Sequence, residues 1–204
     1  MIKTLIFDFG DVFINLDKEA PYIEMKKLGI HSFSEEMIEN NKLYETGKID
    51  TSAFLDYYQK AFPNISKKEL SEAWNSIILD FPEYRLEYIE ALAISKKYQI
   101  ILLSNTNDLH IEKVIENITL ERFQRFKNCF DAFYFSQEIH LRKPNSDIYN
   151  FVLDTHNINP NESLFIDDTK ENTETAKKLG IHTWNIIPKK EDVVDLFLLK
   201  KDIF

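Results

Sequence analysis

The chain has 204 residues, of which 44% are hydrophobic, and it carries 25 basic against 34 acidic residues for a formal net charge of −9. This length fits one domain, or one core with a modest insertion, and excludes a long repeat array. The acidic balance repels a phosphate backbone, so nucleic acid is not expected as a partner. A single cysteine, Cys129, excludes an internal disulfide framework and a cysteine-based zinc cluster.

No apolar run approaches the ~20 residues that a membrane helix needs, so no membrane partner is expected. The N-terminal residues run straight into a strand-like stretch, without the charged leader, apolar core and small-residue cleavage site of a secretory signal. Together with the lone cysteine, these features predict a cytoplasmic protein. They leave open whether the protein is a monomer or a homodimer.

Residues 2–9 (IKTLIFDF) predict a buried strand, because a continuous apolar run ends abruptly at Gly10-Asp11. Four further short runs have the same character, at residues 99–104, 132–136, 163–167 and 181–187. Helical patterns alternate with these runs from residue 82 onward. This order predicts an α/β fold with a parallel sheet that is covered by helices on both faces.

Residues 10–98 separate the first two predicted strands, which is far more than the ~30 residues of a whole βαβ unit. Helix-start signals occur within this gap: capping-box spacing at Ser32 with Glu35 and at Ser66 with Glu69, and a third possible cap at Asp50. We therefore expect an all-helical insertion over residues 17–81, with residues 1–16 and 82–204 forming the core.

Polar side chains close the predicted strands, and the carboxyl ends of parallel strands are where such sheets bind ligands. These residues are Asp8, Ser104, Asn105, Lys143, Asp167 and Asp168. Three carboxylates cannot all ionise within a few ångströms without a cation, and an all-oxygen set suits Mg²⁺. With the metal bound, the lysine and the hydroxyl and amide donors would complete a phosphate receptor. Asp8 is the candidate nucleophile, which would form an acyl phosphate that water then hydrolyses.

These motifs resemble the haloacid dehalogenase (HAD) superfamily over nearly the whole chain. The family's four motifs match IFDFGDV with Asp8, LLSNTND with Ser104, LRKPNSDIY with Lys143, and FIDDTKEN with Asp167 and Asp168. The resemblance implies a doubly wound, Rossmann-like core, with the insertion as a helical cap that closes over the active site and selects substrates. Within the superfamily, the motifs are similar to a bacterial branch that includes α-D-glucose-1-phosphate phosphatases.

The resemblance also implies a Mg²⁺ site. It assigns Asp8 as both nucleophile and metal ligand, and it adds the backbone carbonyl of Gly10 and the carboxylate of Asp168 as ligands. Asp167 would either ligate the metal directly or hold a metal-bound water, and the sequence does not settle which.

Further roles follow from the same resemblance. Ser104 and Asn105 would hydrogen-bond the phosphate, Lys143 would steady Asp8 and the phosphate, and Asn172 would support the acidic pair from behind. The implied activity is Mg²⁺-dependent hydrolysis of a small phosphorylated metabolite, with sugar phosphates such as a sugar 1-phosphate as candidates, through an aspartyl-phosphate intermediate.

One position departs from the family pattern. Most phosphatases of the superfamily have a second aspartate two residues after the nucleophile, which protonates the leaving group and later activates water; here that position is Gly10. Either the neighbouring Asp11 or water would have to replace it. Losing a general acid/base typically forfeits ~10²–10⁴-fold in rate, and the loss is smallest for leaving groups that need little protonation. The sequence therefore favours an anomeric sugar phosphate or another activated ester.

Two alternatives stay open. A metal-independent 2-haloacid dehalogenase would use the same aspartate on carbon, but Asp167-Asp168 would then repel the nucleophile without a cation. A non-catalytic protein that binds phosphate ligands would explain Gly10, although the other motif residues are intact. In the insertion, Gly47 lies between two helical patterns, where it either ends a helix or lets the backbone approach a substrate.

Overall fold

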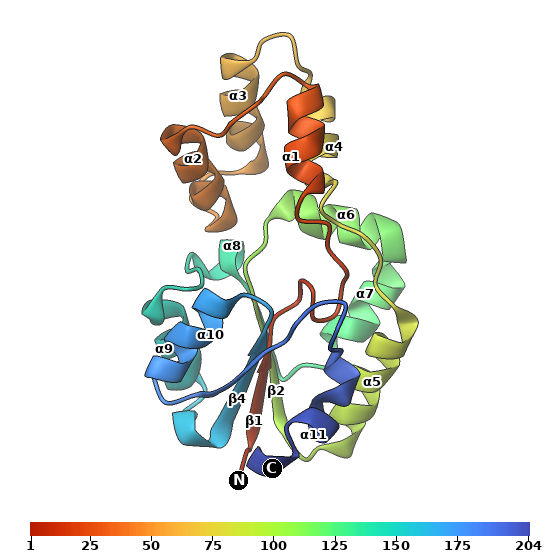
Figure 1. Ribbon diagram of the computed structural model, residues 1–204, viewed down its shortest axis with the longest axis vertical. Coiled ribbons are helices and arrows are strands. Elements are labelled where there is room, and N and C mark those ends of the chain that lie inside the picture. Colours follow the sequence, from red (N-terminus) through yellow and green to blue (C-terminus); the bar gives the residue numbers. More distant parts are fainter.

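The computed structural model describes all residues from Met1 to Phe204, and at its centre lies a five-stranded sheet (Figure 1). The strands are β1 (Thr4–Phe7), β2 (Gln99–Ser104), β3 (Ala132–Phe135), β4 (Ser163–Asp167) and β5 (His182–Asn185). All neighbouring pairs are parallel, in the order β3-β2-β1-β4-β5, so that β1 lies in the middle. The α/β fold with a parallel sheet is confirmed, although β1 and β5 are shorter than the apolar runs that predicted them.

The other regular elements are helices, joined to the strands by turns and loops. They are α1 (Ala20–Lys27), α2 (Glu35–Glu45), α3 (Thr51–Ala61), α4 (Lys67–Asn75), α5 (Glu83–Ser95), α6 (Asp108–Ile118), α7 (Leu120–Lys127), α8 (Ser136–Ile139), α9 (Ser146–Thr155), α10 (Lys170–Lys178) and α11 (Leu196–Leu199). Three short 3₁₀ helices lie at Pro160–Glu162, Val193–Asp195 and Lys201–Ile203. None of the helices has the length and apolar character needed to cross a bilayer.

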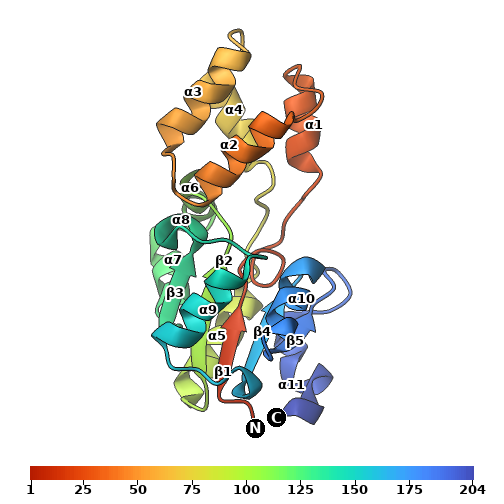
Figure 2. The ribbon, with the colours of Figure 1, turned by 90° about the vertical axis from the view of Figure 1, so that its left-hand side faces the viewer.

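Alternating side chains of the strands build a separate apolar layer on each face of the sheet. In β1, Leu5 and Phe7 pack with residues of α5, α6, α7 and α11, whereas Ile6 packs with residues of α9 and α10. Figure 2 shows the sheet between these two groups of helices. Because both faces are covered, the central strands β1, β2 and β4 are largely apolar, and polar chemistry is left to their carboxyl ends.

Helices α1–α4, which we call the insertion, stand beyond the carboxyl ends of the strands (Figures 1 and 2). They have a hydrophobic cluster of their own, in which Tyr44 stacks on Phe54 with ring centroids 4.3 Å apart. Leu109 of α6 joins this cluster, so the core supplies one apolar side chain to the insertion. A helical insertion after β1, as predicted, is therefore present.

Two of the three predicted caps in the insertion are confirmed. Ser66 and Glu69 form a reciprocal capping box at the start of α4, and the Asp50 side chain accepts a hydrogen bond from the Ala53 amide. The prediction at Ser32 is wrong: α2 begins two residues later, with Ser34 accepting from the Met37 amide. A serine caps only where its hydroxyl reaches an amide one turn ahead, and at Ser32 the chain is still bending.

Two linkers connect the insertion to the core, and they are hydrogen-bonded to each other. The amide of Asn15 donates to the Asp80 carbonyl at 2.8 Å, the Leu79 amide returns a bond to Asn15 at 3.1 Å, and the Asp17 amide donates to Ile77 at 2.9 Å. Arg85 of α5 donates to the side chain of Asn15 at 3.0 Å. The chain thus leaves and re-enters the core at one place.

Candidate active site

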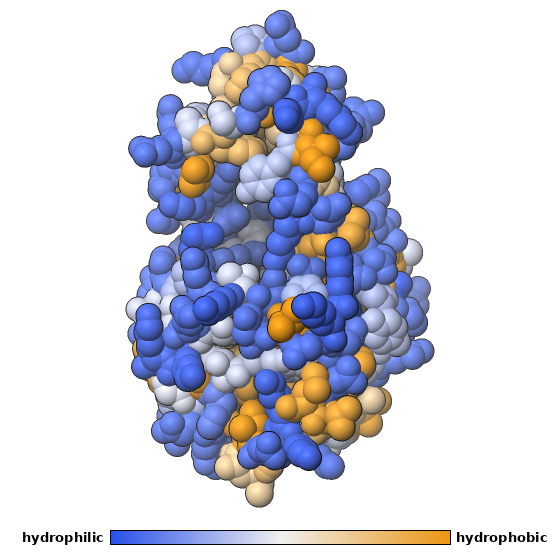
Figure 3. Space-filling model, viewed as in Figure 1, coloured by the Kyte–Doolittle hydropathy of each residue, from blue (hydrophilic) through white to orange (hydrophobic).

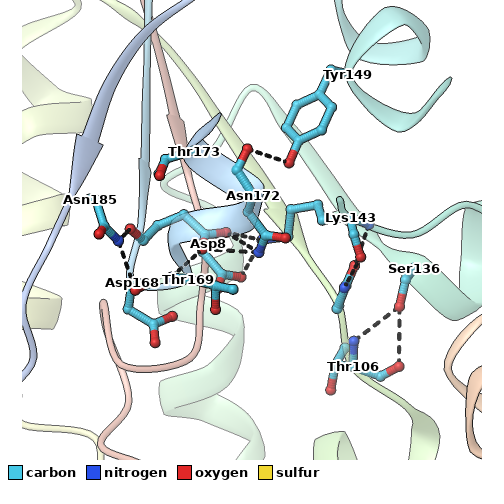
Figure 4. Close-up of polar contacts among 12 residues, drawn as sticks. Asp8, Thr106, Ser136, Lys143, Tyr149, Asp168, Thr169, Asn172, Thr173 and Asn185 are labelled. Atoms are coloured by element: carbon cyan, nitrogen blue, oxygen red, sulfur yellow. Dashed lines mark hydrogen bonds and ion pairs between the residues drawn. The ribbon is translucent and has the colours of Figure 1, made fainter. Parts of the chain in front are cut away.

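Asp8, Lys143 and Asp167 form a buried charged group at the carboxyl ends of β1 and β4. The Lys143 ammonium lies 2.9 Å from Asp8 Oδ1 and 2.6 Å from Asp167 Oδ2, and its side chain is fully buried. Burial disfavours the charged lysine, but the carboxylates of Asp167 and Asp8 outweigh it and raise the pKa of Lys143 above its ordinary value. The lysine is therefore a fixed positive charge that faces the nucleophile candidate (Figure 4).

The protein holds both oxygens of the Asp167 carboxylate. Oδ1 accepts from the Thr169 amide at 2.8 Å, and the Asn172 side-chain amide lies 3.0 Å from both oxygens. Tyr149 fixes Asn172 in turn, by donating to its carbonyl at 2.9 Å. Burial raises the pKa of Asp167 to about 6, against the opposing charge of Lys143 and with a further contribution from Asp8. The carboxylates here carry more negative charge than Lys143 neutralises, and a bound cation would compensate for the excess.

Asp168 completes the acidic group and faces a different partner. Oxygens of Asp8, Asp167 and Asp168 all lie within 4.8 Å of one another. Burial and the nearby Asp8 carboxylate raise the pKa of Asp168, although Lys18 partly offsets this by donating a hydrogen bond to it. Lys18 comes from the first linker, and its ammonium also lies 3.2 Å from Asp11 Oδ2.

The neighbouring Asp11 has a left-handed backbone and a side chain whose two oxygens both have partners. Its backbone has a left-handed φ of 53°, and its Oδ1 accepts from the Leu16 amide at 3.0 Å while Oδ2 pairs with Lys18. Both carboxylate oxygens are therefore held within the segment that follows β1. The same Lys18 ammonium contacts Asp168, so Asp11 lies beside the acidic cluster and would have to give up the Leu16 amide or Lys18 to act as an acid/base.

Ser104 and Asn105 follow β2 at the same edge, but their side chains have different surroundings. Ser104 ends β2 and is 2% exposed. The Asn105 amide donates to the Lys143 carbonyl at 2.8 Å, and its carbonyl oxygen accepts from the Lys143 amide at 2.9 Å. This reciprocal pair fixes the backbone of Lys143. The Asn105 side chain is thus committed to positioning the lysine, and the predicted phosphate contact would fall to its backbone.

The residues fit a Mg²⁺ ion. Oxygens of three carboxylates converge, while the buried ammonium of Lys143 contacts only Asp8 and Asp167 among them. Carboxylate oxygens in an all-oxygen cluster are the ligands that Mg²⁺ prefers. The same edge, with a fixed cation on one side and carboxylates on the other, can bind a phosphate once a metal neutralises the acids.

A comparison with protein families agrees with this geometry. The model of the haloacid dehalogenase-like hydrolases matches residues 5–186, which include every motif residue described above. The chain belongs to this family. Within the HAD-like hydrolases, the chain is similar to two named phosphatases and to one solved structure.

The D-ribitol-5-phosphate phosphatase of Bacteroides thetaiotaomicron is 26% identical, over 90% of this chain and 91% of its own length. A phosphorylated carbohydrates phosphatase of Thermotoga maritima is 24% identical, over 88% of this chain and 82% of its own. Among solved structures, the HAD family enzyme bt-2542 of B. thetaiotaomicron, in complex with magnesium and inorganic phosphate, is 32% identical with a TM-score of 0.77 and covers 94% of this chain and 97% of its own.

One charged residue near the site, Lys18, escaped the sequence reasoning. Lys18 contacts Asp168 across 150 residues of sequence, and Glu45 of α2 pairs with Arg142 across 97. Arg142 adjoins Lys143 in the LRKP motif, and Glu45 lies close to Gly47, where an approach to the substrate was one of the two interpretations. No motif marks Lys18, so its contact appears only in the folded chain.

Proposed function

We propose that this HAD-like hydrolase is a Mg²⁺-dependent phosphatase of a phosphorylated sugar or polyol, acting through Asp8. The observation that carries the proposal is the buried Lys143, which touches both Asp8 and Asp167 while Asp168 completes the cluster. A nucleophilic carboxylate beside a fixed ammonium and a metal site suits attack on a dianionic phosphate. The two curated relatives act on sugar or polyol phosphates, as their names state.

The metal ligands that we propose are Asp8, Asp168 and the backbone carbonyl of Gly10. Asp167 would hold a metal-bound water, because its oxygens are already engaged by Lys143, Thr169 and Asn172. Bound Mg²⁺ would neutralise the carboxylates and the phosphate oxygens, so that the anionic nucleophile and the anionic ester can meet.

In the first step, a carboxylate oxygen of Asp8 bonds to phosphorus while the ester P–O bond breaks, and the leaving oxygen takes its proton from water. In the second step, water attacks the acyl phosphate, which releases inorganic phosphate and restores the carboxylate. Lys143 holds charge on Asp8 and the phosphate in both steps, and Asn105 keeps the lysine in position. Ser104 would donate its hydroxyl to a phosphate oxygen.

The choice of ester follows from Gly10. Without an acid at this position, esters whose leaving group needs little protonation react with the smallest penalty. We therefore propose sugar 1-phosphates, the substrates of the α-D-glucose-1-phosphate phosphatase branch, ahead of terminal esters such as ribitol 5-phosphate. If 5-phosphates or 6-phosphates are hydrolysed faster than 1-phosphates, this preference is wrong while the phosphatase proposal stands.

Residues 17–81 act as the cap in this proposal, and residues 1–16 and 82–204 as the catalytic core. The cavity that Lys18, Glu45 and Arg142 help to line would receive the part of the substrate beyond the phosphate. The insertion lies over the carboxyl ends of the strands, where such a cap has to be.

The test is a panel of phosphorylated metabolites assayed for phosphate release with Mg²⁺, beside Asp8→Asn. We expect turnover of sugar or polyol phosphates, and a loss of at least about 10³-fold in the variant, because an amide is a poor nucleophile. Halide release from 2-haloacids that persists in chelator would instead indicate the dehalogenase. Binding of phosphate analogues without any turnover would indicate the non-catalytic protein.

A further inference from the structure

A large open cavity lies among α1, α2 and α4 of the insertion and reaches the core at His110 and Arg142. Its volume is about 960 Å³, and Figure 3 shows the surface hollowed at this level. Lys18, which contacts Asp168, lines it on the side of the acidic cluster, and Glu45 and Arg142 line it between α2 and the loop that leads to Lys143. A substrate whose phosphate lies at the acidic cluster would therefore extend its remaining groups into this cavity.

Glu45 and Arg142 form an ion pair across the boundary between insertion and core. Arg142 Nη2 lies 2.9 Å from Glu45 Oε2, and each side chain is 27% exposed. The Nε atom of Arg142 is buried and has no hydrogen-bond partner. Nε itself is inaccessible, so a ligand that enters the cavity would contact the exposed parts of the two side chains.

The backbone around Glu45 is held against the core. Its carbonyl accepts from the Ser136 hydroxyl at 2.6 Å, and the next carbonyl, that of Thr46, accepts from His140 Nδ1 at 2.8 Å. Gly47 follows with a φ of 61°, so close to the core that a Cβ there would lie 2.1 Å from the Gln137 carbonyl oxygen. Glu45 is thus presented to the cavity from a fixed backbone.

Charge limits what the pair can bind. The Arg142 guanidinium is already neutralised by Glu45, so the pair as a whole has little attraction for a second anionic group. What it offers is a row of N–H donors beside carboxylate acceptors, which match groups that both donate and accept. Hydroxyl groups have this character.

We propose that Glu45 and Arg142 are specificity-determining residues that bind the hydroxyl groups of the uncharged part of the substrate. The inference rests on the proposed phosphatase function and adds the two residues that would select hydroxylated phosphate esters over esters that lack hydroxyl groups. Sites built to hydrogen-bond a substrate hydroxyl discriminate strongly against analogues that lack it, because their polar groups are then left unpaired.

The experiment compares hydroxylated esters with matched esters that lack hydroxyls. The pairs are ribitol 5-phosphate with pentyl phosphate, and glucose 1-phosphate with cyclohexyl phosphate, assayed on the wild type, Glu45→Gln, Arg142→Lys and Asp8→Asn. Arg142→Lys keeps the charge opposite Glu45 but removes the planar guanidinium with its several N–H donors, so it separates hydroxyl binding from a simple tether between insertion and core. Lys48→Ala, at an exposed position three residues from Glu45, is the matched control.

We expect Arg142→Lys and Glu45→Gln to lower kcat/KM for the hydroxylated ester by about 10- to 100-fold, and for its partner by less than about 3-fold. Lys48→Ala should leave both values unchanged. An equal fall for both members of a pair would identify a tether and overturn the inference, as would no change at all. If Glu45→Gln does not fold, Arg142→Lys alone decides. If the wild type hydrolyses none of the four esters faster than Asp8→Asn, the phosphatase proposal fails and takes the inference with it.

Discussion

Restoring an acid at position 10 is the most informative perturbation of this site. Gly10 has no left-handed φ, so its backbone accepts an aspartate without strain. A Cβ there would lie 2.7 Å from Leu16 Cδ1, and its next nearest contact is Leu16 Cγ at 3.7 Å. The close atom is the end of a flexible side chain, which can move by a rotamer adjustment costing about 1 kcal/mol. Gly10→Asp should therefore fold.

The expected gain depends on the leaving group. A positioned general acid/base contributes ~10²–10⁴-fold, and we allow about one factor of ten for imperfect placement of a side chain that has to displace Leu16. For ribitol 5-phosphate, whose alkoxide leaving group needs a proton, we expect kcat/KM to rise by about 10- to 1,000-fold in Gly10→Asp. For p-nitrophenyl phosphate, whose leaving group departs without one, the change should stay below about 3-fold.

The assay is phosphate release with saturating Mg²⁺, with Gly10→Asn as the matched control. Asparagine has the same shape and displaces Leu16 in the same way, but it cannot donate and recover a proton as a carboxyl group can. A rise that is equal in both variants, or equal for both esters, would refute the reasoning. The missing acid would then not limit this enzyme, and Gly10 would have another purpose.

Three further predictions follow from the charges and the backbone. Chelation of Mg²⁺ should abolish turnover and lower the melting temperature, reversibly on adding the metal back, because the acidic cluster loses its counter-charge; Asp8→Asn should reduce the metal-dependent rise in melting temperature. Burial lowers the pKa of His110 to about 4 from 6.5, so below pH 6.5 the unfolded chain binds a proton that the folded chain refuses. The free energy of unfolding should fall by about 2 kcal/mol from this group between pH 7 and pH 5, and by clearly less in His110→Gln, as urea titrations would show; an identical pH dependence in both proteins would contradict it. Gly47→Ala should destabilise the protein more than Gly29→Ala. Both glycines have positive φ, but a Cβ added at Gly47 would clash with a backbone carbonyl, whereas a Cβ added at Gly29 has nothing within 4 Å. Equal urea midpoints for the two variants would contradict the close packing of Gly47 against the core.

The positions of the strands along the chain and the edge that carries the chemistry could be predicted from sequence, because both depend on local patterns. Apolar runs that end in polar residues located all five strands, and Asp8, Asp167 and Asp168 do meet at one edge. Helix starts were less secure: Ser32 and Ser34 have similar neighbours, and the path of the chain, which the pattern does not encode, decided between them.

The partners of the site residues were beyond sequence reasoning. The side chain of Asn105 is bound to the backbone of Lys143, 38 residues away, rather than left free for phosphate. Asp11 is held by the Leu16 amide and by Lys18, a side chain that no motif marks. Such contacts join segments that only the tertiary fold brings together, so residue type alone shows what a side chain can do but not what already occupies it.

The paired linkers have an evolutionary consequence. Because Asn15 and Asp80 lie side by side, the segment between them is attached to the core at a single junction. That segment can be lengthened, shortened or exchanged without rethreading a strand, since it leaves after the carboxyl end of β1, rejoins before α5 and contributes no strand to the sheet. Of the groups around the acidic cluster, Lys18 is the one carried by the interchangeable segment. A lineage could therefore acquire a new substrate by replacing this segment, while the residues of the core that act on the phosphate are inherited unchanged.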